Sequence, residues 1–306
     1  MTHLDRRQFI LATLRAALAT AATGTVPTLW LPRPALAAPP GPLVALRKGA
    51  NIPQLVDEVL AALGGMKNFV KAGETVVVKP NIGWDRPVEL AANTHPLVVR
   101  RVIEHCLEAG AKRIQVFDRS SNDPRRCYVA SGIQEAVEGL GSKRVSIEHM
   151  ERRAYQDLDI GQGVELTRWS FYQPALEADR FINLPIAKHH SISRLTLGMK
   201  NVMGVIGGDR GMLHRRLDEA LSDINSVVHS DLTLIDATRI LVANGPQGGR
   251  LEDVRQSETL VASADIVAAD ALATTLFDLK PEEISILVTA ARRGLGVMDL
   301  GKVRRV

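Results

Sequence analysis

The sequence predicts an α/β protein in which a mostly parallel sheet is flanked by helices. Two observations carry this prediction. Short runs rich in β-branched residues end at proline, asparagine or aspartate, and segments with helical apolar spacing separate them. Removal of a 37-residue leader from the 306 residues would leave 269, which fits a single domain over 38–306. Two closely packed α/β halves are the alternative.

The first half of this domain alternates helices with strands. The expected strands are 74–79, 113–117 and 144–148, and the expected helices are 52–63, 97–109 and 133–140. The run ETVVVK at 74–79 is typical of a strand covered on both faces. Thr94 and Pro96 predict the start of the helix over 97–109, with Thr94 as its cap.

The second half resumes the pattern after a polar, irregular stretch at 149–175, where we expect a hairpin or a cover for the sheet edge. The expected strands are 179–185 and 232–235, the latter ending at Asp236. The expected helices are 213–228, 265–277 and 284–291. Strands that alternate with helices in this way predict parallel pairing through crossover connections.

Residues 1–37 predict a twin-arginine signal peptide. Arg6-Arg7 precede Phe9-Ile10, a weakly apolar stretch follows, and Ala35-Leu36-Ala37 fits cleavage after Ala37. An uncleaved anchor is the alternative, but prolines leave too short an apolar run to span about 30 Å of hydrocarbon. We therefore expect export to the periplasm, or otherwise out of a bacterial cytoplasm, through the twin-arginine machinery. We expect no stable membrane insertion after cleavage.

The charge and cysteine content exclude several classes of protein. Without the leader, 34 basic residues face 33 acidic ones, and aromatics make up only 4% of the chain, so we expect no nucleic-acid partner. Cys106 and Cys127 are the only cysteines, which excludes a cysteine-ligated iron–sulfur cluster within this chain. Cys106 lies on an apolar helix face, which favours a buried thiol over a disulfide with Cys127.

Ionisable residues collect where the expected strands end. Lys79, Asp118, Lys188 and Asp236 lie at or just beyond these ends. The carboxyl ends of parallel strands share one edge, where ligands of open α/β sheets bind. For each residue taken alone, a solvated loop charge is the alternative.

The densest cluster is formed by Lys188, His190, Lys200, Asn201 and His214, with His189 beside it. Lysines and imidazoles in an apolar, glycine-rich stretch predict a site for a carboxylate or phosphate. We expect three catalytic residues, Lys188, Lys200 and His190. His190 is the first choice as acid/base, and His95 and His214 are the alternatives. The expected ligand-binding residues are Lys79, Asn81, Asn183, Asn201, Asp118 and Asp236. Alternatively, Lys188 and Lys200 form structural ion pairs with Asp118, Asp223 or Asp236.

A metal site is a further hypothesis, with His95, His190 and His214 as ligands. No local ligand spacing marks these histidines, so metal and cofactor stay open. The sequence contains neither a GxxxxGK[ST] phosphate loop nor a GxSxG elbow, and its glycines do not form a dinucleotide fingerprint.

A series of motifs resembles the family named domain of unknown function 362. The series comprises Val78-Lys79-Pro80-Asn81, Thr94-His95-Pro96, Ile182-Asn183-Leu184-Pro185, Lys188-His189-His190 and Met199-Lys200-Asn201-Val202-Met203-Gly204. In order and spacing the resemblance covers about residues 74–275. Some relatives carry a ferredoxin-like module with cysteine-bound clusters, and this chain lacks those cysteines. The family is distantly similar to the amino-terminal domain of nickel-dependent lactate racemase, which implies a Lys/His site for small acids.

The resemblance itself implies no reaction. From the leader and the Lys/His cluster, we expect an exported enzyme that acts on a small anionic substrate through a Lys/His site. A non-catalytic accessory protein that binds a metal, a cofactor or a partner is the alternative.

Overall fold

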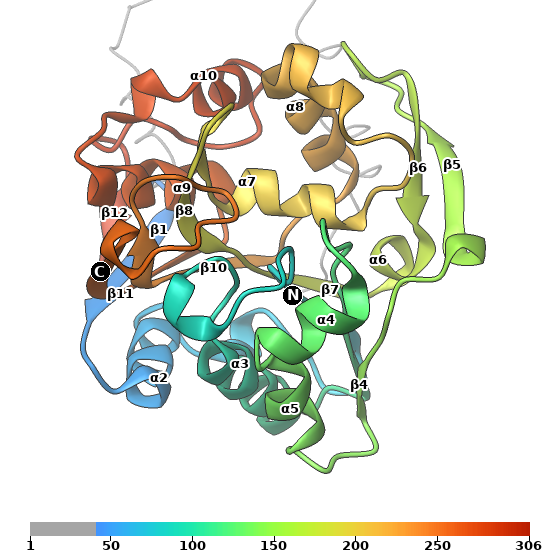
Figure 1. Cartoon of the computed structure of the whole chain (residues 1–306), viewed down its shortest axis with the longest axis vertical. Helices are drawn as coiled ribbons and strands as arrows, with labels where there is room; N and C mark the ends of the chain where they lie inside the picture. The colour runs from blue at the N-terminus through green and yellow to red at the C-terminus, as the bar shows by residue number, and fades with distance from the viewer. Residues whose placement is uncertain (1–40) are drawn as a thin grey trace, which may run out of the picture. The chain divides into compact units, whose positions relative to one another are not determined.

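A ten-stranded mixed sheet organises residues 41–306, the part of the chain that the computed structural model describes (Figure 1). The main path runs β12-β1-β11-β10-β7-β2-β3-β4, while β8 pairs with β10, and β9 with β8. The strands are β1 (Leu43–Lys48), β2 (Thr75–Pro80), β3 (Arg113–Val116), β4 (Val145–Ile147), β7 (Arg180–Leu184), β8 (Ile186–His190), β9 (Arg194–Thr196), β10 (Leu232–Leu241), β11 (Val254–Ser263) and β12 (Arg304–Arg305). From β10 to β4 all neighbours are parallel, whereas β11 is antiparallel to β10 and β1. The predicted α/β class with a mostly parallel sheet is confirmed.

Helices cover both faces of this sheet (Figure 1). The helices are α2 (Ile52–Ala62), α3 (Pro96–Glu108), α4 (Pro124–Ala130), α5 (Ile133–Glu138), α6 (Gln173–Glu177), α7 (Gly198–Asn201), α8 (Leu217–Val227), α9 (Ile266–Thr274) and α10 (Ser285–Arg292). Val76 and Val78 of β2 belong to the core on the side of α2 and α3, and Val77 belongs to the core on the side of α8 and α9. Successive strand residues point to opposite faces, so a strand between two cores is apolar throughout.

The predicted leader, residues 1–37, lies outside the described residues. Within 41–306, no helix combines the length and the apolar character needed to cross a bilayer.

The N-cap of α3 lies one residue later than predicted. His95, not Thr94, is the N-cap of α3, and its Nδ1 accepts a hydrogen bond from the Leu97 N–H at 3.1 Å. The Thr94 hydroxyl is buried and used elsewhere: it accepts from the Asn81 N–H at 2.8 Å and donates to the Leu184 carbonyl at 2.7 Å. Thr94 therefore ties the segment that follows β2 to the last residue of β7.

The predicted end of a strand at Asp236 is wrong. Strand β10 continues to Leu241 and is buried along its whole length. It continues because β11 pairs with it throughout, with a register shift between Ala237 and Arg239. The polar sequence of β8 and β9 gave no strand prediction, since Lys188, His189 and His190 carry no apolar alternation.

The stretch at 149–175 contains a hairpin, as predicted. Strands β5 (Tyr155–Asp159) and β6 (Arg168–Tyr172) pair antiparallel, and Phe171 bridges to Ile206. Both cysteines are free and buried, which agrees with the expected buried thiol at Cys106.

Candidate functional site

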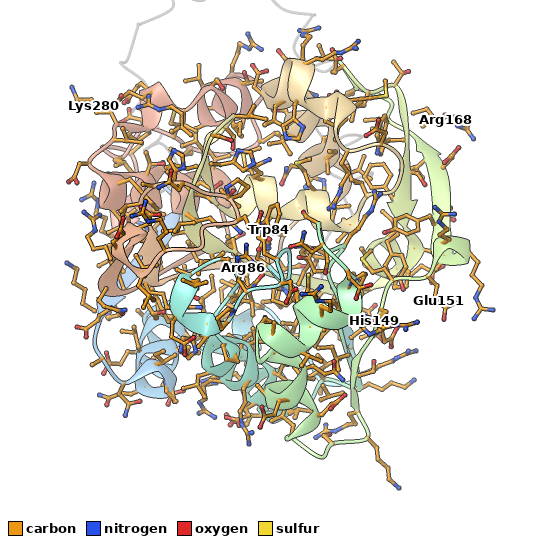
Figure 2. The ribbon with its side chains drawn as sticks, in the orientation of Figure 1. Trp84, Arg86, His149, Glu151, Arg168 and Lys280 are labelled. Atoms are coloured by element: carbon orange, nitrogen blue, oxygen red, sulfur yellow. The ribbon has the colours of Figure 1, made fainter. Side chains whose placement is uncertain are left out.

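A cleft of about 380 Å³ opens at the carboxyl ends of β2 and β3, beside β8. Eight predicted site residues line it: Lys79, Asn81, Asp118, Lys188, His190, Lys200, Asn201 and His214. Figure 2 shows Trp84, which also lines the cleft, on the loop that follows β2. Lys79 and Asp118 lie at or just beyond strand ends, as predicted, whereas Lys188 lies within β8.

Lys79 forms a buried ion pair at the floor of the cleft. Its Nζ lies 2.8 Å from Asp118 Oδ1 and donates to Asn201 Oδ1 and the Pro80 carbonyl, each at 2.9 Å. Burial lowers the pKa of Lys79, and the charge of Asp118 opposes that shift. Lys79 therefore has one ion-pair partner and two hydrogen-bond acceptors within the described residues.

Asn201 is held by a network that extends behind the cleft. Its amide donates to Asn183 Oδ1 at 2.8 Å and to the Lys79 carbonyl at 3.2 Å, and its Oδ1 also accepts from Asn81 Nδ2 at 3.1 Å. Asn183 is fully buried in β7 and does not line the cleft. Asn201 thus fixes the positions of Lys79 and Asn81, and Asn183 fixes Asn201.

Glycines explain why the segment 198–204 approaches this network so closely. A Cβ on Gly204 would overlap Asp118 Oδ1 and the end of the Lys79 side chain.

The start of α7 is held by the Asp270 carboxylate, which accepts from the N–H groups of Gly198 at 2.7 Å and Met199 at 2.9 Å. Burial raises the pKa of Asp270 to about 7.

Lys188 and Lys200 are buried in the cleft without a carboxylate. Lys188 Nζ donates to the Ala92 carbonyl at 2.5 Å and to Asn81 Oδ1 at 3.2 Å, whereas Lys200 Nζ contacts Met203 Sδ at 3.6 Å. Within 41–306, neither lysine forms an ion pair. Burial lowers the pKa of Lys188 to about 7 and that of Lys200 to about 8.

The alternative that these two lysines form structural ion pairs is therefore wrong, because the acidic residues have other partners. Asp118 pairs with Lys79, Asp223 with Arg293 at 2.7 Å, and Asp236 with Arg239 at 2.9 Å. Asp236 also does not line the cleft, since β10 continues past it.

Two arginines that the sequence analysis missed line the same cleft. Arg119 donates to the carbonyls of Ile206 at 2.9 Å and Gly208 at 3.0 Å, and Arg210 donates to those of Arg119 at 2.8 Å and Ser120 at 3.1 Å. In the described part of the chain, neither guanidinium forms an ion pair. Two signals could have indicated them: Arg119 follows Asp118, and Arg210 lies in a glycine-rich stretch just before His214.

Thr196 is a second missed residue. Its side-chain oxygen is buried, lines the cleft and has no hydrogen-bond partner among residues 41–306. Thr196 is opposite Lys188 in the β8–β9 pair. A buried hydroxyl without a partner costs free energy, so a water molecule or a ligand in the cleft is needed to supply one.

The two histidines of the cleft hold opposite tautomers, as assigned from their backbone partners. His190 Nδ1 accepts from the N–H groups of Ile192 at 3.1 Å and Ser193 at 3.3 Å, so the proton of the neutral ring is on Nε2. His214 Nδ1 lies 3.1 Å from the Gly211 carbonyl, which can only accept, so here the proton is on Nδ1. The rings are nearly parallel, with centroids 6.2 Å apart.

The expected convergence of His95, His190 and His214 on a metal is wrong. His95 caps α3 and lines a separate hollow with Arg239, away from the cleft. Among the described residues, no group of three or more His, Cys, Asp or Glu is placed to hold a metal ion. Moreover, a neutral His190 with its proton on Nε2 offers no lone pair to the cleft.

Residues 76–275 match the family described as "Domain of unknown function (DUF362)". The "Thylakoid-associated protein sll1697" of Synechocystis sp. (strain ATCC 27184 / PCC 6803 / Kazusa) is 30% identical over 245 residues, which are 78% of this chain and 73% of that protein. A protein from Thermotoga maritima has a similar structure, with a TM-score of 0.44 and 14% identity, over 76% of this chain and 60% of its own. The lactate racemase apoprotein from Thermoanaerobacterium thermosaccharolyticum gives a TM-score of 0.48 and 11% identity, over 76% and 56%. This chain spans less than two thirds of either solved chain.

Proposed function

The chain belongs to the family of domain of unknown function 362, and we propose that it is an exported enzyme that binds a small, multiply charged anion in the Lys/His cleft. The family description assigns no reaction. The proposal therefore rests on the chemistry of the cleft.

One observation carries the proposal: four cationic side chains line the cleft, and none has a carboxylate partner within residues 41–306. They are Lys188, Lys200, Arg119 and Arg210. Lys188 and Lys200 are buried, and Arg119 and Arg210 are half-buried. Positive charge that is removed from water without a counter-ion is costly, and a bound anion would reduce that cost. Concave sites with a few convergent polar groups are the usual places where small molecules bind.

The hydrogen-bonding groups of the cleft favour an oxyanion. Three groups of the cleft have a proton to donate and, in the described part of the chain, no oxygen acceptor: Thr196 Oγ1, His190 Nε2 and Lys200 Nζ. Carboxylate and phosphate oxygens accept such bonds, and charge-assisted bonds are the strongest of their kind. Lys188 and Lys200, with pKa values of about 7 and 8, can exchange protons near neutral pH, which favours catalysis over passive binding.

Anion binding is tested with three probes: sulfate, inorganic phosphate and succinate. Titration calorimetry on wild type should show binding of at least one probe, and Lys200→Met should weaken it about 10- to 100-fold, as expected for the loss of a charge-assisted bond of about 1.5–3 kcal/mol. The exposed Lys67 provides the matched control, Lys67→Met, which should bind like wild type. Absence of binding by all three probes, or equal binding by Lys200→Met, would overturn the proposed anion site.

The alternative function is a non-catalytic accessory protein. Incubation with a panel of small carboxylic acids and phosphomonoesters, followed by NMR, distinguishes the two. An enzyme converts a member of the panel and loses turnover in Lys200→Met, whereas an accessory protein binds without conversion.

Export is supported by the leader pattern alone. Replacement of Arg6 and Arg7 by lysine should keep the full-length chain in the cytoplasm, while the wild-type chain should be recovered outside it with Ala38 as its first residue. Recovery of an uncleaved wild-type chain would contradict the proposed signal peptide.

A further inference from the structure

We propose that His214 is the proton acceptor of the cleft and that His190 is a fixed hydrogen-bond donor. This assignment reverses the roles expected from the sequence, in which His190 is the acid/base. It rests on the proposed function, because it assigns roles within the same anion-binding cleft.

His190 is unsuited to accept a proton. Both of its backbone partners, the N–H groups of Ile192 and Ser193, occupy the lone pair of Nδ1. Protonation there would break two hydrogen bonds and place a second cation beside Lys200. Burial and the charges of Lys200, His214, Lys188 and His189 hold the pKa of His190 at about 3, in agreement with this geometry. The ring therefore presents one N–H to the cleft.

His214 has the complementary arrangement. Its Nδ1–H donates to the Gly211 carbonyl, one turn earlier in the segment 211–216, which leaves the lone pair of Nε2 free. The ring is half-buried and lines the cleft. A backbone carbonyl that fixes the tautomer of a histidine in this way orients the other nitrogen for acid–base work.

The two rings together suit a ligand that carries one ionisable hydrogen. In the proposed step, the X–H bond of the bound anion breaks, the electron pair stays on X, and the proton forms a new N–H bond on His214 Nε2. His214 becomes imidazolium, and the negative charge that develops on the ligand is stabilised by His190 Nε2–H and the cation of Lys200. A neutral histidine whose N–H stabilises developing negative charge is a recognised catalytic arrangement.

Diethyl pyrocarbonate tests the assignment, because it acylates the unprotonated nitrogen of a neutral imidazole. The complete mature chain is labelled at pH 7, with and without sulfate, and mapped by mass spectrometry. We expect His214 to be labelled and to be protected by sulfate, while His190 stays unlabelled; the exposed His229 serves as the internal reference. Labelling of His190 as fast as His214, or of His229 but not His214, would overturn the proposal.

Two variants separate chemistry from folding. The variant His190→Asn carries a side-chain Oδ1 that can still accept from the N–H groups of Ile192 and Ser193, so labelling of His214 should persist.

In ¹⁵N-histidine NMR spectra of wild type, His214 should show the Nδ1–H tautomer and His190 the Nε2–H tautomer, and His214→Asn assigns the first signal. The opposite tautomers would overturn the proposal. If His214 is labelled equally with and without sulfate, the anion site fails while the roles of the two rings stand.

Discussion

The floor and the wall of the cleft use the same residue type in opposite ways. On the floor, Lys79 has a carboxylate and two further oxygen acceptors. The wall of the cleft carries Lys188 and Lys200. Lys200 is almost as buried as Lys79, yet among residues 41–306 its ammonium group has a single hydrogen-bond partner, the thioether of Met203. Burial alone therefore does not distinguish a structural lysine from a functional one. The distinction is whether the protein itself supplies the counter-charge.

The largest expected effect comes from breaking the floor. Lys79→Met leaves the Asp118 carboxylate buried without its cation, so we expect a loss of about 3–5 kcal/mol in the free energy of unfolding. Urea denaturation followed by circular dichroism measures this loss. Lys200→Met, which removes no ion pair, should not reduce stability.

A double variant checks the cause. Lys79→Met with Asp118→Asn removes both charges, so it should recover more than half of the stability lost in Lys79→Met. If the single variant is as stable as wild type, or if the double variant is no better than the single one, Lys79 and Asp118 are not a structural pair.

An intermediate effect is expected where the chain approaches the floor most closely. Gly204→Ala places a methyl group against Asp118 and Lys79, and overpacking of this kind costs about 1–3 kcal/mol. Gly161→Ala is the matched control, since a Cβ there meets no atom within 4 Å. It should change the free energy of unfolding by less than about 0.5 kcal/mol. If the two variants are equally stable, Asp118 and Lys79 can shift to accommodate the added methyl group, and the expected overpacking at Gly204 is contradicted.

The sequence was most informative where one physical rule dominates. Val76, Val77 and Val78 lie alternately in two cores and are all apolar, so the strand over 74–79 could be predicted from its residues. Strands β8 and β9 could not, because Lys188 and His190 take their places from pairing with β10 and β9, not from apolar alternation. Tertiary pairing likewise carries β10 beyond Asp236, which looked like a strand end.

The sequence predicted which residues line the cleft better than it predicted what each of them does there. Strand-end geometry correctly placed Lys79 and Asp118 at one cleft, whereas Lys188 reaches that cleft from the middle of β8 and Asp236 does not line it. It could not show that Asp118 neutralises Lys79 and leaves Lys188 without a carboxylate, since charge pairing depends on side-chain positions far apart in sequence. Nor could it assign histidine tautomers, because these depend on single backbone groups such as the Gly211 carbonyl.

The smallest expected effect is on the pH dependence of sulfate affinity, which should come from the lysines of the wall. Sulfate keeps its double negative charge from pH 7 to 9, so any change in its affinity reports the protein. Because burial lowers the pKa of Lys200 to about 8, its protonated fraction falls as the pH rises through that value. Loss of this cation should weaken sulfate binding about tenfold between pH 7 and 9, and calorimetry at constant ionic strength measures it.

Comparison with variants assigns that pH dependence to particular residues. Lys200→Met should show a flatter profile, and what slope remains should come from Lys188, whose pKa of about 7 begins to remove its charge at lower pH. The exposed-site control Lys67→Met should keep the wild-type slope. A wild-type sulfate affinity that stays constant from pH 7 to 9 would show that Lys200 does not contact the anion. The difference between Lys79 and Lys200 would then affect the stability of the protein but not its anion binding.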